Sequence, residues 1–196
     1  MYNKKLLESS SIREKTINDI VNTFNEKNKS EEHHSIRVSL LCEKMGQELG
    51  LPEEKINDLS TAGSLHDIGK IAIKEYILNK PGKYTSDEKK EINRHSEIGY
   101  RILNAINGMS KIAQYVLLHH ERWDGKGYPK GIKGEDIPIE SRIIAIADAY
   151  DAIISDRCYR KALSKEFAIK ELKKNAGTQF DRELVSIFLD KVLKKI

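Results

Sequence analysis

Apolar residues recur at helical spacing through nearly the whole chain, and this pattern limits the folds open to it. They stand three and four positions apart in one segment after another, whereas no stretch alternates apolar and polar residues as a half-buried strand does. Gly50, followed by Pro52, is a helix-ending signal. The spacing predicts an all-α bundle with helices over residues 30–49, 53–67, 86–106, 110–120, 140–155, 164–175 and from 181 onward.

One segment, residues 121–138, does not follow the helical pattern. It holds four of the 12 glycines, two of the four prolines and the single tryptophan. A loop of this length without secondary structure is uncommon in a compact domain and usually serves a function. Residues 69–85, with the turn signal Asn79-Lys80-Pro81-Gly82, form a second irregular stretch. We therefore expect a helical bundle with one long, Gly/Pro-rich functional loop.

Length and composition are those of an ordinary folded domain. The 196 residues suffice for one sizeable core, and we divide them into an N-terminal helical extension, 1–29, and one domain, 30–196. The 34 basic residues nearly balance the 30 acidic ones, and no run of like charge suggests an arm for a nucleic-acid polymer. Cys42 and Cys158 are expected to be free thiols. Since no signal peptide or membrane-spanning segment is evident, we expect a cytoplasmic location and no membrane partner. The chain is expected to be a monomer or a homodimer.

Two adjacent pairs of metal-ligand residue types stand out. His66 is followed by Asp67, and His119 by His120. Neighbouring residues on a helix point about 100° apart, so both members of a pair can reach a metal that lies over a helix end. A carboxylate has two oxygens and can bridge two metals. Mixed histidine and carboxylate ligands suit Fe, Mn, Zn, Co or Ni, whereas Ca and Mg prefer oxygen alone.

Three further candidates, His34, His95 and Asp148, lie on the apolar stripes of their helices. An ionised aspartate on an apolar face needs a compensating partner. For Asp148 this partner is either a metal or an arginine, Arg142 or Arg157. Each inward histidine taken alone also fits a hydrogen-bonded core residue. Together, five histidines and two aspartates from separate helical segments indicate a metal centre.

The motifs around these residues resemble the HD-GYP family, a branch of the HD-domain phosphohydrolases. His66-Asp67-Ile68-Gly69-Lys70 is similar to the HD signature, and Gly127-Tyr128-Pro129 after the paired histidines is similar to the GYP motif. The resemblance covers residues 30–190. Further matching segments are His34–Val38, Ile146–Ala152, Ser155–Arg160 and Gly177–Asp181.

The resemblance implies an HD-domain helical bundle that hydrolyses cyclic di-GMP with two divalent transition-metal ions. Fe or Mn are the first choices, with Zn, Co and Ni as others. In the family pattern Asp67 serves both metals. The remaining ligands would be His34, His66 and Asp148 at one metal, and His95, His119 and His120 at the other.

The same resemblance implies roles around the metals. Asp67 and Lys70 would be catalytic, with Lys70 on the scissile phosphate. Arg157, Arg160 and Tyr128 would contact the substrate. The Gly127–Pro129 loop would shape the rim of the site or meet a protein partner. A metal-activated hydroxide would attack phosphorus and release linear 5′-pGpG, with GMP as a further product.

The residues alone leave other interpretations open. Lys70 fits a solvated cation at a helix end, and Gly127-Tyr128-Pro129 fits an ordinary turn. The two arginines fit structural partners of Asp151 or Asp156. The functional alternatives are an HD phosphohydrolase for another cyclic dinucleotide or nucleotide, and a non-catalytic module that binds cyclic di-GMP or serves as a scaffold.

Two positions depart from the family pattern. Some members carry a glutamate one helical turn before the first histidine and bind a third metal, whereas this chain has Ser30 there. The difference favours two metals, although the adjacent Glu31 leaves a third site open. Cys158 stands where the family usually has proline, a change expected to alter loop stiffness more than chemistry.

Overall fold

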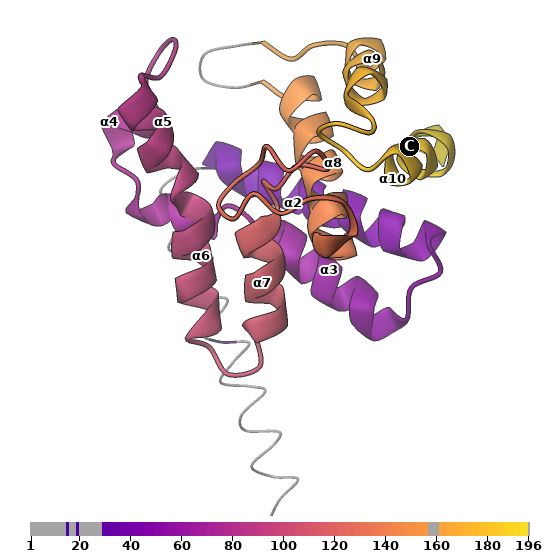
Figure 1. Cartoon of the computed structure of the whole chain (residues 1–196), viewed down its shortest axis with the longest axis horizontal. Coiled ribbons are helices and arrows are strands. Elements are labelled where there is room, and N and C mark those ends of the chain that lie inside the picture. Colours follow the sequence, from indigo (N-terminus) through magenta and orange to yellow (C-terminus); the bar gives the residue numbers. More distant parts are fainter. Residues whose placement is uncertain (1–14, 16–18, 20–28, 157–160, 196) are drawn as a thin grey trace, which may run out of the picture.

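The computed structural model describes residues 15, 19, 29–156 and 161–195 of the chain (Figure 1). Within this part the chain is helical, with one isolated β-bridge between Ala176 and Phe180 and no strand. The prediction of an all-α bundle is confirmed. Almost all of the predicted N-terminal extension lies outside the described residues, as do Arg157, Cys158 and Arg160.

The described helices are mostly short. None of them is long and apolar enough to cross a membrane. In chain order they are α2 (Lys29–Glu48), α3 (Glu53–Leu65), η1 (Ile68–Ala72), α4 (Glu75–Leu78), α5 (Ser86–Asn93), α6 (His95–Asn104), α7 (Ser110–Leu118), η2 (Gly134–Asp136), α8 (Ile139–Ile154), α9 (Lys165–Asn175), α10 (Arg182–Ile187), η3 (Phe188–Val192) and η4 (Leu193–Lys195).

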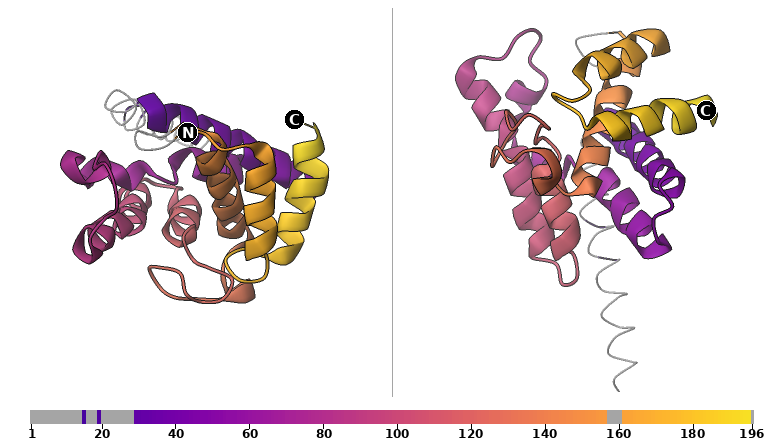
Figure 2. Two further views of the ribbon diagram at one scale, coloured as in Figure 1. Left: turned by 90° about the horizontal axis from the view of Figure 1, so that it is seen from above. Right: turned by 45° about the vertical axis from the view of Figure 1, so that its right-hand side comes forward.

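Helix α8 is the centre of the arrangement. It packs against α2, α3 and α7 on the metal-ligand side and against α9 and α10 in the C-terminal part. Helices α6 and α7 lie side by side as a hairpin, and α6 also contacts η1 (Figures 1 and 2). The α2–α3 pair therefore meets the α6–α7 pair next to α8.

The hydrophobic core fills the space between these helices. It consists of the apolar stripes that the sequence places at helical spacing, and the side chain of Cys42, a free thiol, is buried within it. Burial of these stripes is the main driving force for the bundle. Representative core residues are Val38, Met45, Leu59, Ala62, Leu103, Val116, Ile143, Ala147, Leu172 and Phe188.

Several helix boundaries follow directly from local sequence. Gly50 adopts φ 65°, a left-handed conformation that glycine tolerates best, just after α2 ends. Thr85 and Glu88 form a capping box at the start of α5. Asp181 accepts the backbone N–H groups of Glu183 and Leu184 at the start of α10.

The predicted helix over residues 86–106 is wrong, because it is two helices that meet at Arg94. The break falls where side chains take backbone carbonyls: His95 bonds the carbonyl of Ile92 through Nδ1, and Ser96 donates to that of Asn93. In an uninterrupted helix these carbonyls would accept backbone N–H groups of the next turn. The break gives His95 its place at the start of α6.

The stretch over residues 69–85 is also more regular than predicted. It holds most of η1 and all of α4. Gly69 lies so close to the start of α6 that an added Cβ would fall on the carbonyl oxygen of His95, within 2.6 Å of the backbone nitrogen of Gly99. Only a residue without a side chain permits this approach, which brings Asp67 next to His95.

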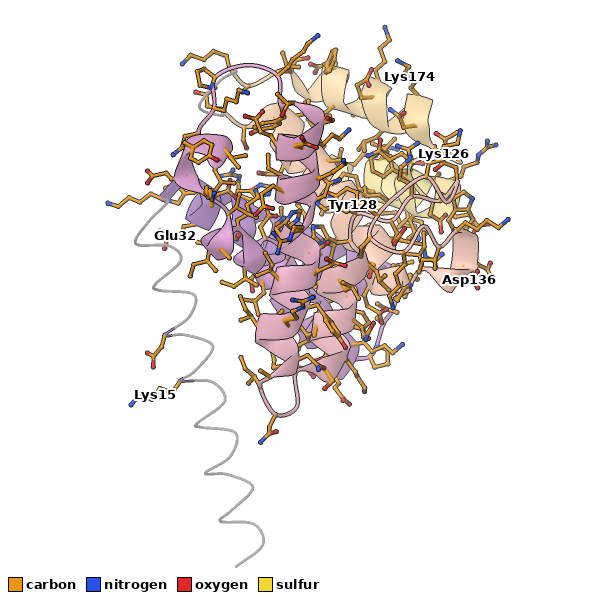
Figure 3. All side chains as sticks on the ribbon, turned by 60° about the vertical axis from the view of Figure 1, so that its left-hand side comes forward. Lys15, Glu32, Lys126, Tyr128, Asp136 and Lys174 are labelled. Carbon is orange, nitrogen blue, oxygen red and sulfur yellow. The ribbon has the colours of Figure 1, made fainter. Side chains whose placement is uncertain are left out.

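The long loop over residues 121–138 is confirmed, with η2 as its only helical turn among the described residues. Two backbone bonds attach it to the segment before α10: Trp123 N–H donates to Gln179, and Asp124 N–H to Thr178, at 3.1 and 2.8 Å. In Figure 3, Lys126 and Asp136 lie at the outer edge of the loop, whereas Tyr128 lies over the helices. The loop is therefore attached to the segment before α10 at Trp123 and Asp124, and its Tyr128 end lies over the helices.

Replacement of Gly69 by alanine should destabilise the protein through backbone overlap with His95. We expect a loss of about 3 kcal/mol or more in the free energy of unfolding and a fall of roughly 6–12 °C in the melting temperature. Gly50→Ala is the control, because nothing lies within 4 Å of its added Cβ. Gly50→Ala should lower the free energy of unfolding by only about 1 kcal/mol, because alanine is less stable than glycine in the left-handed conformation. Equal melting temperatures for the two variants would contradict the proposed close contact.

Candidate metal centre

The structure brings all seven predicted ligand residues together from five parts of the chain. His66 and Asp67 stand between α3 and η1, His95 begins α6, and the other residues come from α2, the end of α7 and α8. Five of the seven are buried: His34, His66, Asp67, His95 and His119 are 0–6% exposed. His120 and Asp148 are half-buried. Convergence of these groups inside the bundle is the central feature of the site.

One cluster comprises His34, His66 and Asp67, whose potential ligand atoms lie within 4.8 Å of one another. Asp67 Oδ2 is 3.2 Å from His66 Nε2 and 3.9 Å from His34 Nε2. Asp148 Oδ1 lies 3.2 Å from His34 Nε2 and 3.9 Å from His66 Nε2. Two imidazoles and two carboxylates therefore face one point.

The second cluster comprises Asp67, His95, His119 and His120. Asp67 Oδ1 is 3.4 Å from His95 Nε2, so the two oxygens of this carboxylate face different clusters. His95 Nε2 lies 3.4 Å from His119 Nε2 and 3.1 Å from His120 Nε2. Asp67 is thus the shared member, as expected for a bridging carboxylate.

The orientation of three histidine rings is fixed by bonds to their own helices. In each case Nδ1 meets the carbonyl oxygen three residues earlier, at 2.6–2.8 Å. A neutral imidazole that donates through Nδ1 carries a lone pair on Nε2, which then faces the centre. The pairs are His66 with Gly63, His95 with Ile92 and His119 with Val116.

These lone pairs require a positive group between them. Burial lowers the pKa of His95 and of His119, so both rings are neutral. Their Nε2 atoms therefore face each other at 3.4 Å without a proton to share. Nε2 of His34 and of His66 also points inward, toward the carboxylates of Asp148 and Asp67 at 3.2 Å. Inward nitrogen lone pairs beside a carboxylate are a donor set that fits divalent transition metals.

The first cluster differs from the second in protonation state. Burial acts to lower the pKa of His34, but Asp148 and Asp151 outweigh it and raise the pKa to about 10. Burial acts to raise the pKa of Asp67, but Lys70 and His66 hold it well below its usual value. A cation that binds here must therefore displace a proton from His34.

Asp151 contacts the candidate ligand His34, a contact that was not predicted from the sequence. It is 1% exposed, and its Oδ2 accepts a hydrogen bond from His34 Nδ1 at 2.7 Å. Arg37 donates to both oxygens of the same carboxylate, at 2.6 and 2.9 Å. A carboxylate behind a ligating histidine fixes the ring and raises its basicity. Asp151 follows Asp148 by three residues on α8, a spacing that could have signalled this role.

Lys70 lies inside the site. Its Nζ is 2.7 Å from Asp67 Oδ2 and 3.0 Å from Glu31 Oε2, and its side chain is 16% exposed. The alternative of a solvated cation at a helix end is therefore wrong. Glu31, which the sequence left open as an additional metal ligand, pairs with Lys70.

Arg142 does not neutralise Asp148, so this alternative is also wrong. Its guanidinium donates to Asp181 Oδ2 at 2.7 Å and lies 5.6 Å from the centre of the Trp123 ring. These contacts join α8, the long loop and the start of α10. Asp148 instead faces the two histidines of the first cluster.

Tyr128 covers the second cluster. Its ring centre is 4.8 Å from that of His120, with an interplanar angle of 32°, and its backbone N–H donates to the carbonyl of His120. Burial and the nearby Asp67 and Asp148 raise the pKa of Tyr128, so the hydroxyl keeps its proton. Gly127 makes the fold-back possible, because an added Cβ would overlap the backbone of Arg122.

Glu121, also missed by sequence analysis, holds the far part of this loop. It is 4% exposed, and its Oε1 accepts the backbone N–H groups of Lys130 and Gly131 at 2.6 and 3.1 Å. These bonds lie directly after Pro129 and fix the turn that carries Tyr128. The position next to His120 was the available signal.

Comparison with known proteins identifies the family. A family model described as HD domain matches residues 13–184. The chain belongs to the HD domain family. The Gly127-Tyr128-Pro129 motif after the paired histidines places it in the HD-GYP branch, as the sequence motifs predicted.

Two curated relatives of this HD domain are longer proteins. A cyclic di-GMP phosphodiesterase of Thermotoga maritima is 40% identical over 174 residues, which cover 87% of this chain and 47% of the relative. 3′3′-cGAMP-specific phosphodiesterase 2 of Vibrio cholerae is 40% identical over 159 residues, which cover 80% of this chain and 30% of the relative. The chain thus spans less than half the length of these relatives.

A solved structure shares the fold of this HD domain. Bd1817, an HDG"Y"P protein from Bdellovibrio bacteriovorus, superposes with a TM-score of 0.70 at 21% identity. The match covers 85% of this chain and 53% of the other. At this identity the likeness concerns the helical bundle itself.

Replacement of Asp151 by asparagine should weaken metal binding without removing a ligand. The amide keeps the shape but not the charge that orients His34, and we expect a loss of about 10–100-fold in affinity for Mn²⁺. The measurement is competition with a fluorescent chelator. Asp190→Asn is the control, since Asp190 of η3 forms an exposed ion pair with Lys194 of η4. An unchanged affinity for Asp151→Asn would show that Asp151 does not support the site.

Metal binding should release protons between neutral pH and about pH 10. His34 has a raised pKa in the metal-free protein, so it is charged at pH 7.5 and must lose its proton when it ligates. We expect the release of about one proton or more per chain at pH 7.5. The release should decline as the pH approaches 10, because His34 is then already partly neutral before metal binds. Calorimetry of Mn²⁺ binding in buffers of different ionisation enthalpy measures this number. A heat independent of the buffer would contradict the prediction.

Proposed function

We propose that this HD domain is a metal-dependent phosphodiesterase that hydrolyses cyclic di-GMP to linear 5′-pGpG, with GMP as a further product. The observation that carries the proposal is the pair of histidine clusters that share Asp67. A shared carboxylate with an imidazole set on each side is the donor arrangement of a two-metal site. The names of the relatives, which include a cyclic di-GMP phosphodiesterase, support this substrate class.

The metal ligands we propose are the seven residues of the two clusters. Asp67 would serve both ions, and mixed histidine and carboxylate donors favour Fe or Mn, with Zn, Co and Ni as alternatives. Divalent ions at such a site supply Lewis-acid chemistry: they lower the pKa of water and offset negative charge on phosphoryl oxygens. The remaining ligands are His34, His66 and Asp148 on one side and His95, His119 and His120 on the other.

The surrounding side chains would bind and orient the substrate. Lys70 brings a buried ammonium next to Asp67, where it can neutralise a phosphate oxygen. Tyr128 keeps its phenolic proton, so its hydroxyl can donate a hydrogen bond to the nucleotide at the rim. Arg157 and Arg160 remain proposed substrate contacts from the sequence motifs. The Gly127–Pro129 loop remains a proposed site for a protein partner.

A second candidate substrate is 3′3′-cGAMP, because a relative at 40% identity is named as specific for it. Both molecules are cyclic dinucleotides with the same phosphodiester linkage. Their discrimination depends on base contacts, which lie outside the seven ligands. A panel of cyclic di-GMP, 3′3′-cGAMP and cyclic di-AMP, tested on one preparation, would rank the three substrates.

His66→Ala and Asp67→Ala should abolish both metal retention and turnover. Loss of a ligand empties the site, and we expect cyclic di-GMP hydrolysis to fall by at least about 100-fold. Protein would be purified without oxygen, its metals measured by elemental analysis, and the same sample assayed. His33→Ala is the matched control, because His33 precedes His34 on α2 but is exposed. Full metal content and turnover in both site variants would contradict the proposed function.

A further inference from the structure

Lys70 lies between two carboxylates of different kinds. Asp67, at 2.7 Å, belongs to both metal clusters, whereas Glu31, at 3.0 Å, belongs to neither. Glu31 comes from the first turn of α2. The side chains of Lys70 and Glu31 are only 16% and 24% exposed, so water weakens this ion pair little. The ammonium therefore has two alternative anionic partners in one place.

The oxygen that Lys70 contacts is the one a metal needs. Asp67 Oδ2 faces His66 and His34 as well as the ammonium. A divalent cation that takes this oxygen meets Lys70 as a like charge at close range, in a setting where charges interact strongly. Without a second anion, Lys70 would oppose metal binding or leave the site.

We propose that Glu31 is a positioning residue that holds the Lys70 ammonium when a divalent cation takes Asp67 Oδ2. This inference rests on the proposed metal centre. Glu31 keeps Lys70 beside the cluster and offsets its charge, so that cation and ammonium occupy the site together. The ion pair thereby couples metal binding on Asp67 to the position of a residue that would contact a substrate phosphate.

The pairing with Lys70 distinguishes this role from metal ligation by Glu31 itself. Oε2 of Glu31 already accepts from the ammonium, and neither cluster includes this residue. A ligand contributes to metal affinity whether or not Lys70 is present. A counter-ion of Lys70 contributes only while Lys70 carries its charge.

The experiment is a double-mutant cycle on metal affinity. Metal-stripped full chain is titrated with Mn²⁺ under anaerobic conditions, in competition with a chelator. The four forms are wild type, Glu31→Gln, Lys70→Met and the double variant. We expect Glu31→Gln to weaken Mn²⁺ binding about 10-fold, the scale of groups that support a metal ligand. Lys70→Met should strengthen binding, and Glu31→Gln should have no further effect in that background.

Glu32→Gln is the matched control, since it removes the same charge one residue along the same helical turn, and Glu32 forms no ion pair within the described residues. Its Mn²⁺ affinity should equal that of the wild type. An equal loss from Glu31→Gln with and without Lys70 would overturn the inference in favour of direct ligation. No effect of Glu31→Gln in either background would overturn it as well.

The same preparations separate this inference from the proposed function. Coupled Mn²⁺ affinities in a protein that cleaves no cyclic dinucleotide would support the role of Glu31 and contradict the proposed activity. If the protein cleaves cyclic di-GMP but Glu31→Gln changes the Mn²⁺ affinity independently of Lys70, the proposed activity is supported and the role of Glu31 is contradicted. Absence of Mn²⁺ binding by the wild type would overturn the inference together with the metal centre.

Discussion

The site depends on the carboxylate of Asp67, whose two oxygens face separate sets of histidines. Oδ2 faces His34 and His66, and Oδ1 faces His95. The backbone must leave α3, turn through η1 and pass very close to α6 to achieve this. Gly69 permits that approach because it carries no side chain. A single backbone contact thus brings the two halves of the candidate centre together.

Burial of so many polar groups would be unfavourable without compensation. The compensation is local for three rings, whose Nδ1 atoms bond carbonyls of their own helices. It is long-range for His34, which relies on Asp151 of α8. What these bonds leave uncompensated is the pair of inward Nε2 lone pairs on His95 and His119, which are neutral and 3.4 Å apart. Divalent cations at this point would accept these lone pairs. Metal binding would therefore add to the free energy of unfolding of the bundle.

The charged residues around the centre form two ion-pair networks. Arg37 and Asp151 support His34 from behind, while Lys70 joins Asp67 to Glu31. The first network fixes a ligand. The second places a cation where a phosphate would arrive. Both connect α2 with elements that follow it later in the chain, so α2 contributes one ligand, His34, and two supporting charges, Glu31 and Arg37.

Sequence alone was sufficient for the all-α class, most helix bounds, the long loop and all seven candidate ligands. These features follow from local periodicity and from residue types that would be costly to bury without a partner. The break at Arg94 was missed because it depends on side-chain bonds to carbonyls that compete with a regular helix. Asp151 and Glu121 were missed because a carboxylate in a sequence does not reveal which donors will reach it.

The sequence by itself therefore determined which elements form and which side chains are capable of binding metal. Only the tertiary structure decided that Asp67 lies between both histidine sets, that Lys70 faces inward to Glu31, and that Arg142 joins Asp181 rather than Asp148. The physical reason is the separation along the chain. Helical periodicity fixes neighbours three or four residues apart, whereas partners such as His34 and Asp151, 117 residues apart, meet only when the helices pack.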